Sequence, residues 1–390
     1  MNCCRFEDRL KGVALALHGP QGRIAANHPD QLPEAFARIE QARRSGAWIA
    51  LLLDYELGEW LEPALADAAL AIRPPAGSGT SVSASAGTPP ADPAPRLTAL
   101  IFDRASHEAP WSSAPARIAR AVANVTRDDY LLRVDQIRRW IAAGEVYQVN
   151  TTFGLDVTTE GSPADLYRHI ASANPVAHAA YIEDEGRTVL SFSPELFLER
   201  TGSTLVTRPM KGTAPRSADP ARDRALGEQL LHSVKDRAEN LMIVDLLRND
   251  MGRIAAPGSV RAHPLFTLER YPTVWTMTST VQATLAEGVD LAQILRALFP
   301  CGSVTGAPKI AAMRKILATE PLARGLYCGS IGWLAPNGDF SLNVAIRTLV
   351  IDGNGRGLYG IGGGIVYDSD PAREWDEAHW KARVLTQIVS

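Results

Sequence analysis

The segment from Tyr327 to Ile351, YCGSIGWLAPNGDFSLNVAIRTLVI, restricts the possible folds more than any other. Two runs rich in β-branched and apolar residues flank Asn337-Gly338-Asp339, and a short turn of this kind between strand-like runs is typical of a β-hairpin. A hairpin joins antiparallel strands, whereas parallel strands need a long crossover connection. The sequence therefore predicts antiparallel sheet in this part of the chain.

Other segments alternate irregularly between helical and strand-like patterns. Residues 127–143 place apolar side chains at helical spacing, and residues 234–250 and 371–389 are two further predicted helices. Residues 188–210 read as two strands joined by a Thr-Gly-Ser turn, and residues 268–285 are rich in β-branched and aromatic residues. Because no regular strand–helix–strand repeat is present, we expect an α+β fold with largely antiparallel sheet.

Composition places the chain among ordinary globular proteins. Of its 390 residues 46% are hydrophobic and 21% charged, and the net charge of −3 lacks the basic excess of nucleic-acid-binding proteins. No apolar run reaches the roughly 18 residues of a membrane span. The N-terminal sequence MNCCRFEDRL has no apolar run typical of a secretory signal, and the four cysteines form no CxxC pair. We therefore expect a cytoplasmic protein that binds neither nucleic acid nor membrane.

Residues 74–96, PPAGSGTSVSASAGTPPADPAPR, consist almost entirely of Pro, Gly, Ser, Thr and Ala. Such a segment cannot bury enough apolar surface to offset its own ordering entropy, so we expect a flexible loop or linker. It lies within a short N-terminal part, residues 1–115, which precedes a larger domain, residues 120–390, in which the patterns are sharper.

A lysine stands out in the turn-rich segment TRPMKGTAPR. Lys211 is followed by Gly212, a residue that lets the backbone approach a ligand closely. A solvated surface lysine is the ordinary interpretation of such a position. A lysine that faces a ligand is the alternative.

Two helices carry pairs of acidic residues. Asp236 and Glu239 are three residues apart, as are Glu374 and Glu377, so each pair shares one helical face. Lys381 lies four residues beyond Glu377 on the same face. Two solvated helical surfaces would explain this pattern, but facing acidic helices would also suit Mg²⁺, which prefers oxygen ligands. No histidine–cysteine cluster favours zinc.

Seven motifs occur in a characteristic order: GEVYQVN, SPELFL, RPMKGTAPR, DRAENLMIVDLLRND, GSVTGAPKIAAM, SLNVAIRTL and GIGGGIVYDSDPAREWDEAHWKA. Together they resemble the chorismate-binding enzymes, which include anthranilate synthase component I, aminodeoxychorismate synthase component I and the isochorismate and salicylate synthases. The resemblance extends from about residue 120 to the C-terminus and identifies residues 120–390 as the catalytic domain. It implies two large, mostly antiparallel β-sheets packed together, with helices outside.

The resemblance also implies a role for each matching residue. Glu195 would be the general acid. Glu239 and Glu377 would bind Mg²⁺ directly, with Asp236 and Glu374 behind them through water. The positions expected to bind substrate are Gln148, Gly212, Thr213, Thr305, Tyr327, Arg347, Gly362, Gly363, Gly364 and Lys381.

Within this family, two positions indicate the nucleophile. By this resemblance, Gln148 occupies the position at which the isochorismate and salicylate synthases carry a lysine that activates water. Lys211 occupies the position at which the anthranilate type carries alanine. Its presence matches the aminodeoxychorismate type and implies that Lys211 is a covalent nucleophile. One residue departs from the pattern, because Thr276 stands where many members carry a histidine.

The resemblance therefore implies amination of chorismate at C4, giving 4-amino-4-deoxychorismate for 4-aminobenzoate and folate synthesis. A glutamine amidotransferase subunit would supply the ammonia, because none of the cysteines here has a glutaminase-like setting. Two alternatives remain at this point: an anthranilate synthase component I, and a non-catalytic subunit that only docks a glutaminase.

Overall fold

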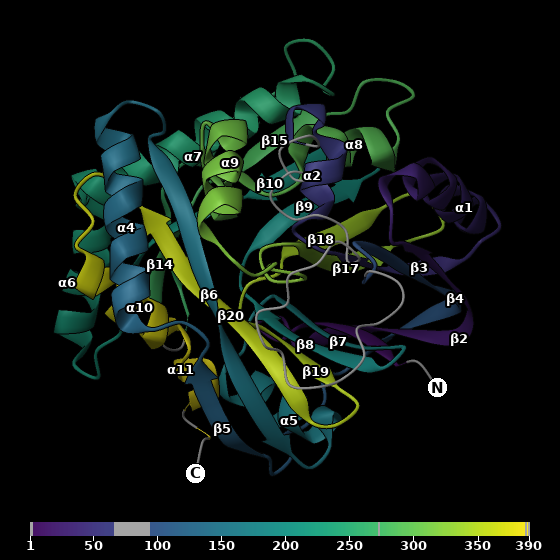
Figure 1. Cartoon of the computed structure of the whole chain (residues 1–390). Coiled ribbons are helices and arrows are strands. Elements are labelled where there is room, and N and C mark those ends of the chain that lie inside the picture. Colours follow the sequence, from purple (N-terminus) through teal and green to yellow (C-terminus); the bar gives the residue numbers. More distant parts are fainter. Residues whose placement is uncertain (1–2, 66–93, 272–273, 387, 389–390) are drawn as a thin grey trace, which may run out of the picture.

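The computed structural model describes residues 3–65, 94–271, 274–386 and 388. Helices cover the outside and strands form the interior (Figure 1). The α+β class and the helices on the outside are confirmed. The Pro/Gly/Ser-rich segment expected at 74–96 lies outside the described residues apart from its last three positions.

Seventeen strands form one continuous antiparallel sheet. Its first half runs, from one edge, through β12 (Arg261–Ala262), β15 (Val281–Thr284), β10 (Thr204–Arg208), β9 (Leu196–Thr201), β18 (Phe340–Val344), β17 (Ser330–Leu334), β3 (Trp48–Leu53) and β4 (Leu97–Glu108). The second half continues through β2 (Val13–Ala26), β1 (Cys4–Asp8), β7 (His178–Asp184), β8 (Arg187–Ser193), β19 (Thr348–Asp352), β20 (Arg356–Ile365) and β6 (Gln148–Glu160), which pairs with β5 (Arg117–Ala123) and β16 (Gly306–Ala307).

The two halves of this sheet contact each other face to face. On β18, the Asn343 amide donates hydrogen bonds to His178 O on β7 and to Ser191 Oγ on β8, although these strands are far apart in the strand order. The two large sheets expected from the sequence are therefore the two halves of a single hydrogen-bonded sheet, joined through β2 and β4. The strands of residues 4–108 are central members of it.

The hairpin predicted from Asn337-Gly338-Asp339 is confirmed, with Ser330 opposite Val344 and Leu334 opposite Phe340. The strand expected to continue to residue 351 is interrupted, because residues 348–352 form β19 and pair with β8 and β20 instead. A second interruption splits the first strand expected within 188–210, since β8 ends at Ser193 and β9 begins at Leu196. Pro194 explains this break, because it has no backbone N–H for a strand ladder.

A separate three-stranded sheet lies beside the large one, with the order β11 (Met210–Pro215), β14 (Val274–Thr278) and β13 (Thr267–Arg270). The remaining elements are helical: α1 (Leu32–Arg44), α2 (Leu57–Leu61), α4 (Arg127–Ala142), α5 (Pro163–Ala173), α6 (Pro220–His232), α7 (Val234–Gly252), α8 (Leu291–Leu298), α9 (Lys309–Thr319), α10 (Pro371–Lys381) and α11 (Arg383–Thr386), with short 3₁₀ turns at Pro29–Gln31 and Gly302–Val304.

Local sequence fixes where the helices that border the site begin. Ser233 caps α7 by accepting a hydrogen bond from Asp236 N. Asp370 caps α10 by accepting from Arg373 N, and Pro371 occupies the first turn, where its missing N–H is not needed. No helix in the described ranges is long and apolar enough to cross a membrane.

Candidate active site

A cavity of about 270 Å³ opens where the three-stranded sheet, α7, α10 and β20 meet. It is lined by most of the residues singled out from the sequence, which come from segments far apart in the chain. These are Glu195, Lys211, Gly212, Thr213, Asp236, Glu239, Tyr327, Arg347, Gly362, Gly363, Gly364, Glu374, Glu377 and Lys381. The turn-rich loop, the two acidic helices and the glycine cluster therefore form one site.

Lys211 is on β11, at an irregularity in the pairing with β14. Its side chain extends toward the glycines of β20, because a methyl group added to Gly364 would lie 3.3 Å from Lys211 Nζ. Within the described residues, Lys211 Nζ forms no hydrogen bond or ion pair. Burial lowers the pKa of Lys211, although Glu239 and Glu195 act in the opposite direction. A lysine of lowered pKa is a better nucleophile at neutral pH.

Glu195 occupies the break between β8 and β9 and is almost completely buried, with 4% of its surface exposed. Its Oε1 accepts a weak hydrogen bond of 3.4 Å from Met210 N, on the residue before Lys211. Burial raises the pKa of Glu195 to about 6, against the opposing influence of the Ser303 hydroxyl and Lys211. A buried carboxyl with a pKa in this range can act as a general acid near neutral pH.

The four acidic residues lie on two walls of the cavity, with Asp236 and Glu239 on α7 and Glu374 and Glu377 on α10. Burial raises the pKa values of Glu239 and Glu374. Glu377 differs, because the ammonium group of Lys381, 2.9 Å away, lowers its pKa. Lys381 Nζ also donates to Gly362 O at 3.0 Å, which fixes this lysine between α10 and β20.

These carboxylates would need substrate and water oxygens to complete a magnesium site. Within the described ranges, no three His, Cys, Asp or Glu side chains are grouped closely enough to hold a metal by themselves. Mg²⁺ commonly takes only one or two protein carboxylates and fills its remaining positions with water and substrate oxygens. The acidic side chains on α7 and α10 offer only oxygen atoms, which suits that pattern. Mg²⁺ is therefore a reasonable proposal for this site.

Cationic and aromatic groups line another side of the cavity. Arg347 has a left-handed backbone, with φ of 51°, and burial lowers the pKa of its guanidinium. The ring of Tyr327 lies directly on Gly360, where an added methyl group would come within 2.1 Å of Tyr327 Cγ. The lack of a side chain at residue 360 therefore allows Tyr327 its position in the wall.

Two predicted substrate-binding residues do not line the cavity. Thr305 is fully buried, and its hydroxyl donates to Cys301 O and Gly302 O, so the structure gives it a role in shaping the loop. Gln148 is also fully buried, and neither polar atom of its amide has a hydrogen-bond partner among the described residues. A methyl group added to Gly364, which lines the cavity, would lie 2.6 Å from Gln148 Nε2. The Gln148 amide is therefore directly behind this part of the cavity wall.

Further lining residues were not predicted, and Asn150, Lys235, Ser303 and Trp380 are among those with polar atoms in their side chains. Asn150 and Ser303 belong to the motifs GEVYQVN and GSVTGAPK, so the motifs themselves were the available signal. Lys235 directly precedes Asp236 and Trp380 directly precedes Lys381. No property of their own sequence positions distinguishes these two from ordinary helix surface residues.

Comparison with known proteins finds a matching family and named relatives. A family model described as chorismate binding enzyme matches residues 1–387. An aminodeoxychorismate synthase component 1 from Klebsiella aerogenes is 44% identical over 269 residues, which cover 69% of this chain and 59% of that protein. An anthranilate synthase component 1 from Streptomyces coelicolor is 41% identical over 268 residues, covering 68% of this chain and 52% of that protein. The chain thus spans less than two thirds of the length of these curated relatives.

Solved structures share the fold. An anthranilate synthase component I from Streptococcus pneumoniae superposes with a TM-score of 0.79 at 22% identity, over 96% of this chain and 92% of that chain. A menaquinone-specific isochorismate synthase from Escherichia coli gives a TM-score of 0.75 at 19% identity, over 100% of this chain and 89% of that chain. The expected anthranilate synthase component I-like fold is confirmed.

Proposed function

Because the chain belongs to the family of chorismate-binding enzymes, we propose that it aminates chorismate at C4 and forms 4-amino-4-deoxychorismate, a precursor of 4-aminobenzoate and folate. The observation that carries this proposal is the position of Lys211. It lies in the same cavity as Glu195 and the four carboxylates, without an ion pair of its own among the described residues. Relatives named aminodeoxychorismate synthase component 1, at 39–44% identity, support the same reaction.

In the first step, the neutral amine of Lys211 attacks C2 of chorismate. The ring double bonds shift, and the hydroxyl at C4 leaves as water after it takes the proton of Glu195. This leaves Lys211 bonded to C2 as a secondary ammonium and Glu195 as a carboxylate. The raised pKa of Glu195 suits this step, because a general acid must hold its proton until the leaving group departs.

In the second step, ammonia attacks C4, the double bonds shift back, and Lys211 leaves C2 as a neutral amine. The new ammonium group at C4 gives a proton to the Glu195 carboxylate, so both residues return to their starting states. Two displacements in sequence put the nitrogen on the carbon that lost the hydroxyl. Direct attack of ammonia at C2 would give the anthranilate type of product instead.

The other lining residues bind and orient the substrate. Arg347, Tyr327 and Lys381 would hold its carboxylates, and the glycines of β20 allow the ring to lie close to the backbone. Glu239 and Glu377 would hold Mg²⁺, with Asp236 and Glu374 behind them through water. When bound to the ring carboxylate, Mg²⁺ neutralises its charge and withdraws electron density from the ring.

We propose that a glutamine amidotransferase subunit delivers the ammonia. Burial raises the pKa of Cys3 to about 11 and those of Cys301 and Cys328 to about 12, and it raises the pKa of Cys4 strongly as well. Thiols of this kind are poor nucleophiles at neutral pH, because the thiolate is the reactive form. The chain should therefore use ammonium salts but not glutamine when it is alone.

Product identification tests the proposal. The purified chain is incubated with chorismate, Mg²⁺ and an ammonium salt, and the products are separated and identified by mass and absorbance. We expect 4-amino-4-deoxychorismate, no product from glutamine alone, and glutamine-dependent product once the amidotransferase is added. Anthranilate as the main product would assign the chain to the anthranilate type, and no turnover of chorismate with ammonium would leave a non-catalytic docking subunit as the correct interpretation.

A further inference from the structure

The backbone that carries Lys211 contains an extra residue. On β11, Met210 pairs with Thr278 and Thr213 pairs with Thr276, so three steps along β11 match only two steps along β14. The additional residue makes Lys211 and Gly212 a β-bulge in an otherwise regular antiparallel ladder. A bulge changes the direction in which a side chain points and is common beside active sites.

Gly212 permits this shape of the backbone. Its φ of +84° lies in the left-handed region that favours glycine. A methyl group at this position would lie 3.0 Å from Asp236 Cβ and 3.0 Å from Leu230 Cδ1, so the bulge is also pressed closely against α6 and α7. These contacts limit the bulge from the helix side, but they do not fix the direction of the Gly212 peptide group.

The hydroxyl of Thr276 supplies the missing restraint. Thr276 lies on β14, directly opposite the bulge, and is completely buried. Its Oγ1 donates a hydrogen bond of 3.2 Å to Gly212 O. This bond joins a side chain to the backbone across the irregular part of the ladder.

We propose that Thr276 is a positioning residue that holds the Lys211–Gly212 bulge in the shape that directs the Lys211 side chain into the cavity. The inference rests on the proposed function insofar as Lys211 is the nucleophile. It assigns a role to the position where many relatives carry a histidine. Without the hydroxyl, Gly212 O would lose this hydrogen-bond partner, and the peptide could rotate and carry Lys211 with it.

The test compares three substitutions in β14. Thr276→Val removes the hydroxyl while keeping the shape of the side chain, and Thr276→Ser restores the hydroxyl in a smaller side chain. Thr278→Val is the matched control, because Thr278 lies two residues further on the same strand and its hydroxyl donates to Glu269 at 2.9 Å rather than to the bulge. Thr276→Ala replaces Thr276→Val if the valine variant does not fold.

Two measurements are made on each variant. The first is the rate at which chorismate adds to Lys211 in the absence of ammonia, followed by intact-protein mass spectrometry, together with the dissociation constant for chorismate. The second is amide hydrogen exchange of the peptide that contains residues 210–214, which requires no reaction at all.

We expect Thr276→Val to slow adduct formation by about 10- to 100-fold, because a small displacement of a reacting group has effects of that size. Chorismate should bind with nearly unchanged affinity, exchange should rise within residues 210–214, and Thr276→Ser should restore both properties. Thr278→Val should leave both at the wild-type level.

Unchanged exchange in residues 210–214 of Thr276→Val would overturn the positioning role, as would an equal effect of Thr278→Val on those residues. If wild-type protein forms no adduct but Thr276→Val still increases exchange at the bulge, the covalent role of Lys211 is wrong while the positioning role stands. The two hypotheses therefore fail on different measurements.

Discussion

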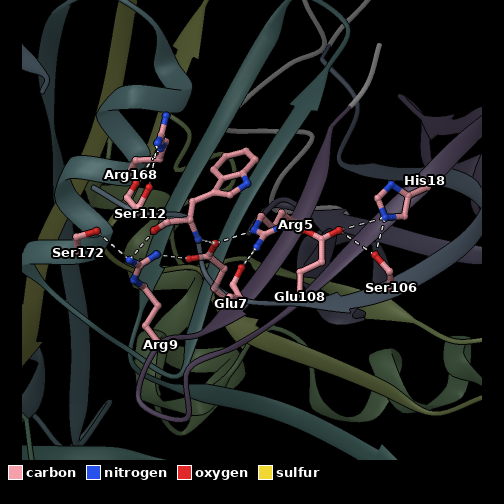
Figure 2. A network of polar contacts seen from close by, with 11 residues as sticks. Arg5, Glu7, Arg9, His18, Ser106, Glu108, Ser112, Arg168 and Ser172 are labelled. Atoms are coloured by element: carbon pink, nitrogen blue, oxygen red, sulfur yellow. Dashed lines mark hydrogen bonds and ion pairs between the residues drawn. The ribbon is translucent and has the colours of Figure 1, made fainter. Parts of the chain in front are cut away.

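Charged side chains are buried or partly buried in two regions of the molecule, and their pairing differs between the two. Near the N-terminal strands, Arg5 is only 2% exposed, and its guanidinium bonds Glu7, Glu108 and Ala109 O (Figure 2). Glu7 in turn accepts from Arg9 and from Trp111 N. Every member of this network has a partner of opposite charge or a polar partner, so the charges are satisfied without a ligand.

The cavity contains charges that lack such partners. Among the described residues, the side chains of Lys211 and Arg347 form neither an ion pair nor a hydrogen bond, and burial lowers the pKa of both. A buried charge is costly unless it is paired, and a fold retains such a group where a bound molecule completes it. The cavity also contains the Lys381–Glu377 ion pair, so the absence of a partner, rather than burial alone, distinguishes Lys211 and Arg347 from the charges of the N-terminal network.

The largest expected effect comes from Lys211→Ala. Removing a covalent nucleophile should lower C4 amination by about 10⁴-fold and abolish the chorismate adduct seen without ammonia. The matched control is Lys309→Ala, because Lys309 is also partly buried but is paired with Asp250 at 2.6 Å and donates to Leu298 O. Lys309→Ala should lower stability and leave the adduct intact. Wild-type amination by Lys211→Ala would show that the lysine acts in another way.

Glu195→Gln should give the next largest effect, a loss of about 10²- to 10⁴-fold in kcat, because the amide cannot donate a proton to the leaving hydroxyl. The pH dependence checks the same role. The pKa of Glu195 is raised to about 6, and its protonated form is the active acid, so wild-type kcat should fall as pH rises above about 6. That decline should be absent from the residual activity of the variant. A wild-type profile that stays level from pH 5 to 8 contradicts the assignment.

Arg5→Met tests the paired side of the comparison. It leaves the buried carboxylate of Glu7 with one cation fewer, so the free energy of unfolding should fall by about 3–5 kcal/mol, while amination per folded molecule stays unchanged. Arg104→Met is the control, because Arg104 is 69% exposed and pairs with Asp103 at 3.5 Å, where a loss of about 0–1 kcal/mol is expected. Urea denaturation and active-site titration measure the two properties. Lost activity with unchanged stability in Arg5→Met would reverse the interpretation of the network.

The smallest of these effects is expected from Glu239→Gln and Glu377→Gln. Each should lower activity by about tenfold or more and raise the Mg²⁺ concentration needed for half-maximal rate, because one oxygen ligand loses its charge. Asp376→Asn on the exposed face of α10 is the control, since Asp376 lies next to Glu377 without lining the cavity. Full activity of either variant in excess chelator would remove magnesium from the proposed site.

The elements that could be predicted from the sequence depend on local patterns. The turn at Asn337-Gly338-Asp339 forms a hairpin because few other backbone arrangements suit those residues, and the acidic pairs on α7 and α10 share a face because helical spacing puts them there. The order of the motifs identified many of the cavity residues, but not all of them. Each of these inferences depends on residues a few positions apart, or on a resemblance carried by the sequence itself.

Tertiary structure alone decided how these elements meet. Nothing in the sequence showed that β2 and β4 join two halves of one sheet, or that the Tyr327 ring lies on Gly360. The bulge at Lys211 arises from the register between β11 and β14, which are far apart in the chain. The sequence also did not show that Gln148 and Thr305 are buried and do not line the cavity, because both belong to motifs whose other residues do line it. Register, close approach and burial are set by long-range packing, so the sequence determined which residues gather and the fold determined which of them face the cavity.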